Sequence, residues 1–222
     1  MNELFTDIAN CIEFGKVNKT SPYPPNMRDM DGAEELTLKA LNSGFAAQEI
    51  LTKGLMVGME KVGIKFRDNK VFVPQVLMSA KAMNSAMVHL KPYFESGEVQ
   101  RKGTFIIGTV MGDLHDIGKN LVAMMVEGNG YKVVDLGTDV QSERFIQAIQ
   151  ENPGASVGLS ALLTTTMNNM EVITKDIKES YPETLVLVGG APVNDDFRKK
   201  IGADLYSPDP MGVVEFLNER IA

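Results

Sequence analysis

The chain of 222 residues contains one cysteine, Cys11, two histidines and no tryptophan. A single cysteine excludes an internal disulfide and suits a reducing compartment, so we expect a cytoplasmic protein. A structural zinc site of Cys and His ligands lacks the donors that it needs.

Long apolar runs and an excess of basic residues are also missing. No uninterrupted apolar segment approaches roughly 18 residues, which excludes a transmembrane helix, and the N-terminus lacks the pattern of a signal peptide. The 22 Lys and Arg are outnumbered by 29 Asp and Glu, giving a formal net charge of −7. This acidic balance, without a basic stripe, argues against nucleic acid and anionic membranes as partners.

Apolar residues recur at helical spacing in the first half of the chain. Leu51, Leu55, Met59, Val62 and Phe66 follow one another at steps of four, four, three and four. Together with two earlier helices and one after Pro74, they predict a four-helix bundle as a helical cap domain over 1–95. The expected helices lie at about 2–16, 32–43, 51–66 and 76–90.

The pattern changes after the polar segment 96–103, which we take as the domain boundary. Short apolar runs then alternate five times with helical stretches, which predicts an α/β domain over 96–222. Its expected fold is a flavodoxin-like (Rossmann-type), doubly wound, five-stranded parallel sheet. The expected strands are 104–110, 132–136, 155–160, 184–189 and 203–206, and the expected helices are about 117–129, 141–151, 166–180, 194–201 and 211–221.

The most informative segment reads Gly-Asp-Leu-His-Asp-Ile-Gly-Lys-Asn, from Gly112 to Asn120, directly after the first expected strand. It differs from a phosphate-binding P-loop in its glycine spacing and in the Asn at position 120, where magnesium would need Ser or Thr. His115 has a nitrogen suited to a borderline metal such as cobalt, and Asp113 can hold the other ring nitrogen. Asp113 could equally cap the following helix.

Two further groups follow later strands of the expected sheet. Ser160 and Thr164 come after the third strand, and Gly189 and Gly190 after the fourth. Ligands of doubly wound sheets bind beyond the carboxyl ends of the strands, near the point where strand order reverses. Each group also has a plain explanation, because Ser and Thr cap helices and glycines end strands in turns.

In this order the three segments resemble the cobalamin-binding domain of methyltransferases, whose pattern is Asp-x-His-x-x-Gly, Ser-x-Leu and Gly-Gly. Similar modules occur in methionine synthase and in the corrinoid proteins of methylamine, methanol and O-demethylase systems. The resemblance implies that His115 is the lower cobalt ligand and that Asp113 and Ser160 form its hydrogen-bonded relay. It also implies that the cofactor, methylcobalamin or a related corrinoid, is lined by Gly112, Leu114, Asp116, Gly118, Leu162, Thr164, Gly189, Gly190 and Ser207.

The first half also resembles the helical cap of these proteins, in residues 54–66 and 71–77. The resemblance implies that Phe66 and Val73 cover the reactive face of the cofactor. Most apolar residues of these helices are explained equally well as core. His89 is expected to be structural or exposed, and the proline-rich stretch 20–30 is either a mobile surface loop or a partner-docking loop.

Because cap and cofactor domain account for the whole chain, the resemblance implies a corrinoid methyl carrier that is catalytic only with partners. A substrate-specific methyltransferase would load the methyl group onto cobalt. A second methyltransferase would pass it to tetrahydrofolate or a thiol such as coenzyme M, and a reductive activator would restore the cofactor. A cobalamin-binding subunit of an isomerase, or a cobalamin-based sensor, is the alternative.

Overall fold

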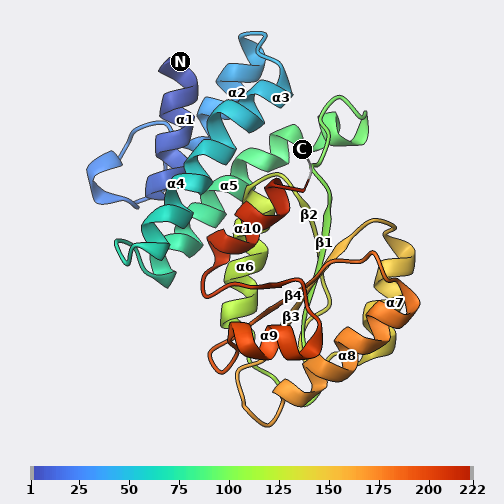
Figure 1. Cartoon of the computed structure of the whole chain (residues 1–222). Helices are drawn as coiled ribbons and strands as arrows, with labels where there is room; N and C mark the ends of the chain where they lie inside the picture. The colour runs from blue at the N-terminus through green and yellow to red at the C-terminus, as the bar shows by residue number, and fades with distance from the viewer. Residues whose placement is uncertain (1–2, 221–222) are drawn as a thin grey trace. The chain divides into compact units, whose positions relative to one another are not determined.

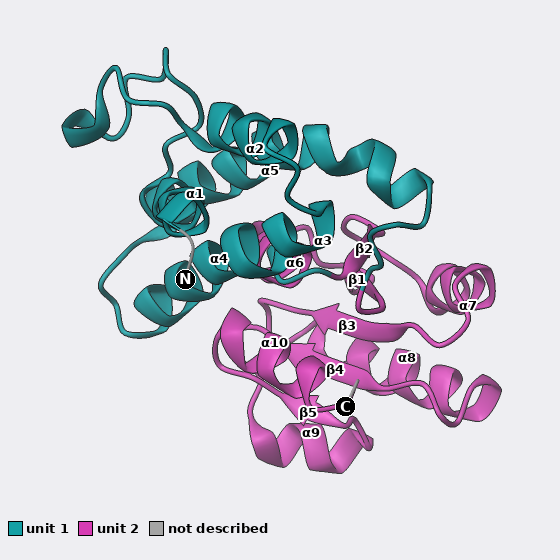
Figure 2. Cartoon of the chain, turned by 90° about the horizontal axis from the view of Figure 1, so that it is seen from above, with its two compact units in different colours: residues 1–101, 128–130 teal, residues 102–127, 131–222 magenta. Residues whose placement is uncertain are grey.

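The computed structural model describes residues 3–220 and divides into two compact units (Figures 1 and 2). The first unit ends at Arg101 and includes Gly128–Gly130, and the second contains Lys102–Glu127 and the chain from Tyr131 onward. Within the described residues, no helix combines the length and the apolar character needed to cross a membrane.

The first unit is helical, as its periodicity predicts. A continuous helical run contains α3 (Ala47–Glu49), the π-helical η2 (Ile50–Leu55) and α4 (Met56–Arg67). Pro74 lies in the first turn of α5, where its missing N–H costs nothing. The other helices are α1 (Glu3–Phe14), α2 (Ala33–Asn42), the short 3₁₀ helix η1 (Pro25–Met27) and α5 (Val73–Glu95).

Close packing explains a glycine that would otherwise weaken α4. A Cβ atom added at Gly58 would lie 2.5 Å from Ile12 Cβ and 2.6 Å from the Ala9 carbonyl oxygen on α1. Glycine in a helix costs about 1 kcal/mol relative to alanine. Here it lets α4 approach the fully buried side chain of Ile12, which belongs to the core of this unit.

The proline-rich stretch is anchored at its base. The ammonium of Lys16, whose side chain is fully buried, donates to the Ser21 carbonyl oxygen at 2.9 Å. Glu35 on α2 accepts from the backbone N–H groups of Lys19 and Gly32, on either side of the stretch. These contacts fix both ends of the stretch, one to Lys16 shortly after α1 and both to Glu35 of α2.

The second unit is a five-stranded parallel sheet in the order β2-β1-β3-β4-β5. This order confirms the predicted flavodoxin-like fold, and a helix follows each strand as expected. The last strand is only two residues long, shorter than predicted. The strands are β1 (Thr104–Thr109), β2 (Lys132–Asp135), β3 (Ser156–Ser160), β4 (Val186–Gly189) and β5 (Leu205–Tyr206).

Helices cover both faces of this sheet. Figure 1 shows α7 and α8 together on one face, with α6 and α10 away from them. Phe145 of α7 and Met170 of α8 are fully buried against Ile106, Val157 and other sheet residues. The helices are α6 (Ile117–Gly128), α7 (Ser142–Glu151), α8 (Met167–Ser180), α9 (Asp195–Ile201) and α10 (Pro210–Asn218).

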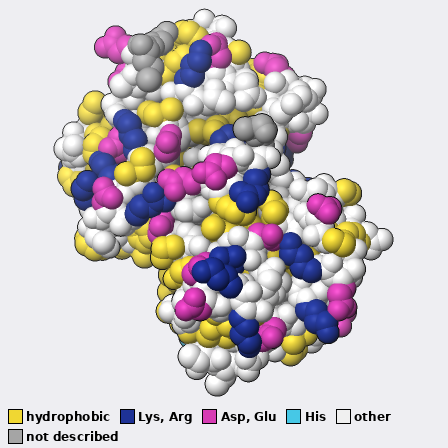
Figure 3. All heavy atoms as spheres, in the orientation of Figure 1, with side chains coloured by type: hydrophobic (Ala, Val, Ile, Leu, Met, Phe, Trp, Pro, Cys, Tyr) yellow, Lys and Arg dark blue, Asp and Glu magenta, His cyan; other side chains and the backbone are white. Residues whose placement is uncertain are grey.

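Charged side chains of both signs are mixed on the face drawn in Figure 3. Lysines and arginines alternate with aspartates and glutamates there, so that face carries no extended patch of one sign. This arrangement agrees with the acidic but dispersed charge of the sequence.

Candidate functional site

Three strands end side by side where the predicted site residues begin. Thr109 of β1 is in register with Ser160 of β3, which is in register with Gly189 of β4. The Thr109 hydroxyl donates to the His115 carbonyl oxygen at 2.8 Å. The carboxyl edge of the sheet therefore holds the loop that contains His115, as the strand order predicts.

Asp113 fixes the orientation of the His115 ring. Oδ1 of Asp113 lies 2.7 Å from Nδ1 of His115 and also accepts from the His115 backbone N–H at 3.1 Å. The aspartate side chain is fully buried, whereas 51% of the histidine side chain is exposed. A carboxylate at Nδ1 places the ring proton there, which leaves the lone pair of Nε2 available to a metal.

The other carboxylate oxygen of Asp113 is bound to the loop after β3. Oδ2 accepts from the backbone N–H groups of Leu162 and Leu163 at 2.8 and 3.2 Å, and from the Thr166 hydroxyl at 2.7 Å. Burial opposes ionisation of this group. The hydrogen bonds from Thr166, His115 and Leu162 outweigh it and hold the pKa of Asp113 well below its ordinary value. Asp113 thus remains an anion beside His115, and none of these donors belongs to α6, which it was alternatively expected to cap.

Thr166 is a site residue that the sequence analysis missed. Its side chain is buried and lies 53 positions from Asp113 in the sequence. The family resemblance implied that the hydroxyl of the relay belongs to Ser160, at the end of β3. In the structure the hydroxyl bound to Asp113 belongs to Thr166, so the role of Ser160 stays a prediction. The run Thr164-Thr-Thr was the available signal, but its spacing did not tell which hydroxyl turns inward.

A second series of linked polar side chains lies at the start of α6, and the sequence did not reveal it. Asp116 accepts from the Asn120 side-chain amide at 3.0 Å, and the Lys119 ammonium donates to Asn120 at 2.6 Å. The Lys119 side chain is 2% exposed and pairs with Asp135 at the end of β2. This chain of contacts ties the residue after His115 to the neighbouring strand.

Apolar side chains around His115 project into solvent. The exposed fractions are 73% for Leu114 and 68% for Ile117, on either side of the histidine. Leu162 and Leu163, beside Asp113, are also more than two-fifths exposed. Large apolar groups gathered at the surface mark a binding site. Here they belong to the two loops that Asp113 joins, one of which contains the half-exposed ring of His115.

The glycines after β4 differ in what surrounds them. At Gly190 the backbone has a φ of 129°, and an added Cβ would lie 1.9 Å from the Ala161 carbonyl oxygen, so only glycine fits. At Gly189 the nearest atom to an added Cβ is the Ser207 carbonyl oxygen, 3.8 Å away. Gly189 and Ser207 therefore border the same space, whereas packing against Ala161 explains Gly190. Thr164 lies exposed in the loop after β3.

The remaining predicted residues lie at the two ends of the loop that contains His115, or in the helical unit. Gly112 has a φ of 81°, and Gly118 has no neighbour within 4 Å of an added Cβ. Phe66 near the end of α4 and Val73 at the start of α5 are half-buried, and their place over a cofactor stays a prediction. His89 is 22% exposed, with Nε2 4.0 Å from Glu34 on α2.

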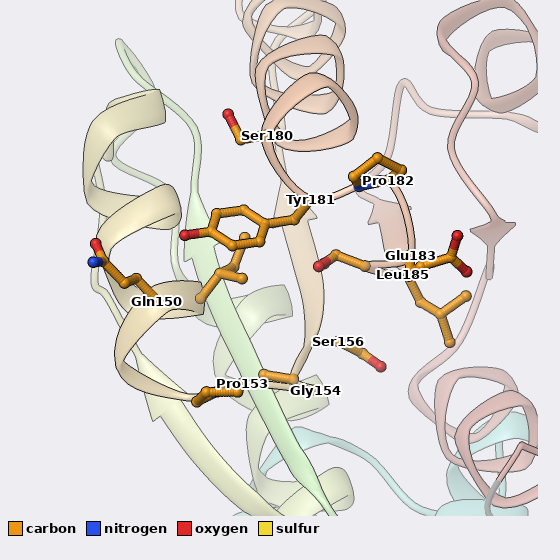
Figure 4. Close-up of a pocket in the computed structure, with 12 residues that line it drawn as sticks. Gln150, Pro153, Gly154, Ser156, Ser180, Tyr181, Pro182, Glu183 and Leu185 are labelled. Carbon is orange, nitrogen blue, oxygen red and sulfur yellow. The ribbon is translucent and has the colours of Figure 1, made fainter.

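A pocket of about 480 Å³ opens at the other edge of the sheet (Figure 4). Ser156, the first residue of β3, lines it together with Tyr181, Pro153 and Leu185. Since His115 follows the carboxyl ends of the strands, this pocket is separate from the histidine loop. It contributes nothing to that site.

The donor set fits a metal that arrives within an organic cofactor. Among residues 3–220, no three His, Cys, Asp or Glu side chains gather to hold a metal ion by themselves. A single histidine nitrogen amid exposed leucine and isoleucine side chains suits a planar apolar macrocycle whose metal needs one more ligand.

Comparison with known proteins shows the family of this chain. A B12 binding domain family matches residues 103–214, and a second B12 binding domain family matches residues 27–91. The trimethylamine corrinoid protein of Methanosarcina barkeri is 44% identical over 182 residues, which is 80% of this chain and 84% of that protein. The chain belongs to the family of B12-binding corrinoid proteins. The resemblance to corrinoid proteins of methyltransferase systems and the predicted corrinoid cofactor are thereby confirmed.

Solved structures of corrinoid proteins agree with the fold. The crystal structure of a cobalamin-binding protein from Desulfitobacterium hafniense matches with a TM-score of 0.75 and 28% identity over all of both chains. The methanol:cobalamin methyltransferase complex of Methanosarcina barkeri contains a chain that matches with a TM-score of 0.83 and 29% identity. That match covers 99% of this chain and 80% of the other.

Proposed function

We propose that this corrinoid protein carries a methyl group between two methyltransferases and that His115 is the lower ligand of its cofactor. The observation that carries the proposal is the 2.7 Å contact between His115 Nδ1 and Asp113, because it reserves Nε2 for a metal. When bound, the corrinoid supplies a cobalt centre that accepts and releases a methyl group. The relatives named for trimethylamine and the methanol methyltransferase complex support a role in such a system.

The protein's own contribution starts with a ligand held in place. Asp113 keeps the proton of His115 on Nδ1, and the backbone N–H groups of Leu162 and Leu163 keep Asp113 ionised. The exposed side chains of Leu114 and Ile117 would pack against a bound macrocycle and limit the access of water to Nε2. The loop therefore offers one imidazole nitrogen whose orientation is fixed by the Asp113 carboxylate.

The partners follow from what the chain provides. Its family domains cover the cofactor site and the helical unit, and we assign the binding of the methyl donor to a substrate-specific methyltransferase. A second methyltransferase would deliver the methyl group to tetrahydrofolate or a thiol such as coenzyme M, and a reductive activator would repair oxidised cofactor. Phe66 and Val73 of the helical unit would shield the reactive face between transfers.

The test is methyl transfer with separate partners. Protein reconstituted with a corrinoid is reduced and incubated with isotope-labelled methylated amines or methanol, with and without candidate methyltransferases. We expect label on the corrinoid protein only when a matching methyltransferase is present, and its onward transfer when an acceptor enzyme is added. A protein that instead takes up adenosylcobalamin in preference to methylcobalamin, and that accepts no methyl group, would favour the isomerase or sensor alternative.

A further inference from the structure

An aspartate in the loop after β2 adopts an unfavourable backbone conformation. Asp139 has a φ of 56°, in the left-handed region, where residues other than glycine lose about 1 kcal/mol or more. Neighbouring residues hold it there. Val140 donates to the Thr109 carbonyl oxygen at 2.9 Å, and Thr109 donates to the Gly137 carbonyl oxygen at 2.9 Å. These bonds extend the pairing of β1 and β2 past the strand ends and bring Asp139 next to the histidine loop.

Asp139 makes two bonds to that loop in opposite directions. Its Oδ1 accepts from the Gly112 backbone N–H at 2.7 Å, and its own N–H donates to the Asp113 carbonyl oxygen at 3.1 Å. Gly112 itself has a φ of 81° and no Cβ, so it has more backbone freedom than any other residue type would have. The two bonds restrain Gly112 and the residue after it, Asp113, whose carboxylate orients the His115 ring.

We infer that Asp139 is a positioning residue for the cobalt ligand, an inference that rests on the proposed function of His115. Its carboxylate holds the Gly112 amide, and this fixes the loop in the conformation that presents Nε2. Without the carboxylate, the loop samples other conformations before the cofactor binds. Ordering the loop then costs free energy on binding, which lowers affinity.

Three substitutions separate the side-chain contact from the backbone strain. Asp139→Asn keeps an oxygen that can accept from Gly112 and tolerates the left-handed conformation. Asp139→Gly removes the acceptor and relieves the strain, whereas Asp139→Ala removes the acceptor and keeps the strain. Asp29, with a φ of 60° in the helical unit, provides the matched control Asp29→Gly.

The first measurement needs no cofactor. Solvent exchange of the Gly112 amide is followed by NMR in the cofactor-free proteins. We expect exchange about fivefold faster in Asp139→Gly and Asp139→Ala, the effect of losing one hydrogen bond. Asp139→Asn and Asp29→Gly should stay close to the unsubstituted protein. Unchanged exchange in Asp139→Gly would overturn the inference, and a defect confined to Asp139→Ala would assign the effect to strain alone.

The second measurement reads the ligand itself. The proteins are titrated with methylcobalamin, and the fraction with histidine ligation is read from the visible spectrum. We expect Asp139→Gly to bind about fivefold more weakly with a smaller ligated fraction, and Asp139→Asn to behave as the parent. Binding by Asp139→Gly equal to that of the parent would refute a positioning role. If the parent shows no histidine ligation, the proposed function fails, and positioning of a cobalt ligand fails with it. The exchange data would then show only whether Asp139 orders the loop.

Discussion

Replacing Asp113 by asparagine is the sharpest test of the site's polar architecture. Both carboxylate oxygens accept hydrogen bonds, one from His115 and the other from Leu162, Leu163 and Thr166. An asparagine amide has one oxygen and one NH₂ group. Whichever way it is placed, the NH₂ group faces donors that can no longer be satisfied.

The expected loss follows from the number and type of these bonds. A hydrogen bond to a charged acceptor contributes roughly 1.5–3 kcal/mol. The asparagine oxygen keeps the bonds on one side only, without the charge, and on the other side the NH₂ group meets a donor. We therefore expect Asp113→Asn to lower the free energy of unfolding of the sheet unit by about 3 kcal/mol. If the amide oxygen faces Leu162 and Thr166, its NH₂ group favours the proton on Nε2 of His115, which removes the ligand.

The effect also has a pH signature. Because the pKa of Asp113 is lowered on folding, its contribution to stability is present above the ordinary aspartate pKa of about 4. It is lost progressively as pH falls from that value towards the lowered pKa of the folded state, by up to about 1.4 kcal/mol per pH unit. Asp113→Asn should therefore flatten the acid side of the stability curve as well as lower it.

Hydrogen exchange on peptides from β1 and β3 in increasing urea is the suitable assay, because a chain of two units need not unfold in one step. Asp116→Asn is the matched control, since Asp116 is exposed in the same loop and should change stability by less than about 0.5 kcal/mol. Equal stability of Asp113→Asn and Asp116→Asn, with the same pH dependence, would refute the reasoning.

Three further predictions test other parts of the chain. Gly190→Ala should lower the free energy of unfolding by more than about 3 kcal/mol, measured by thermal unfolding, because its Cβ meets the Ala161 carbonyl oxygen. Gly154→Ala, at a φ of 79° in open space, should lower it by only about 1 kcal/mol. Equal losses in the two variants would contradict the packing argument. Gly118→Ala should stabilise the cofactor-free protein by up to about 1 kcal/mol, because alanine favours a helix more than glycine does. The same change should weaken corrinoid binding in a spectroscopic titration. Unchanged binding would mean that Gly118 does not belong to the cofactor site. The Cys11 thiol is buried, and burial raises its pKa to about 12, so it should resist alkylation at pH 8 until the protein is unfolded; rapid labelling of the native protein would contradict its burial.

The fold could be predicted because its signals are local. Periodicity within each segment located the strands and helices, and the regular alternation of the two led to the strand order. The five-residue β3 and the segment of α6 lie close to their expected positions. The two-residue β5 is shorter than expected because apolar composition at 203–206 does not determine how many residues pair with β4.

The site could be predicted only in part, because its contacts join distant segments. The loop of Asp113 and His115 follows from a compact motif, and its position follows from the parallel sheet. Thr166 and Asp139 reach that loop from 53 and 27 positions away, and no local pattern distinguishes them from other polar loop residues. Sequence therefore located the loop of Asp113 and His115, but not Thr166 and Asp139, which bind that loop from other segments.

Isotope labelling of histidine tests the central proposal most directly. The chain has only His89 and His115, so protein made with ¹⁵N-histidine and loaded with cobalt(II) cobalamin gives an electron paramagnetic resonance spectrum that is simple to assign. We predict nitrogen splitting that changes on ¹⁵N labelling in the parent, and we predict that this label-dependent splitting disappears in His115→Ala but persists in His89→Ala. Splitting in the parent that is unaffected by the label, or label-dependent splitting that survives in His115→Ala, would contradict histidine ligation at this site.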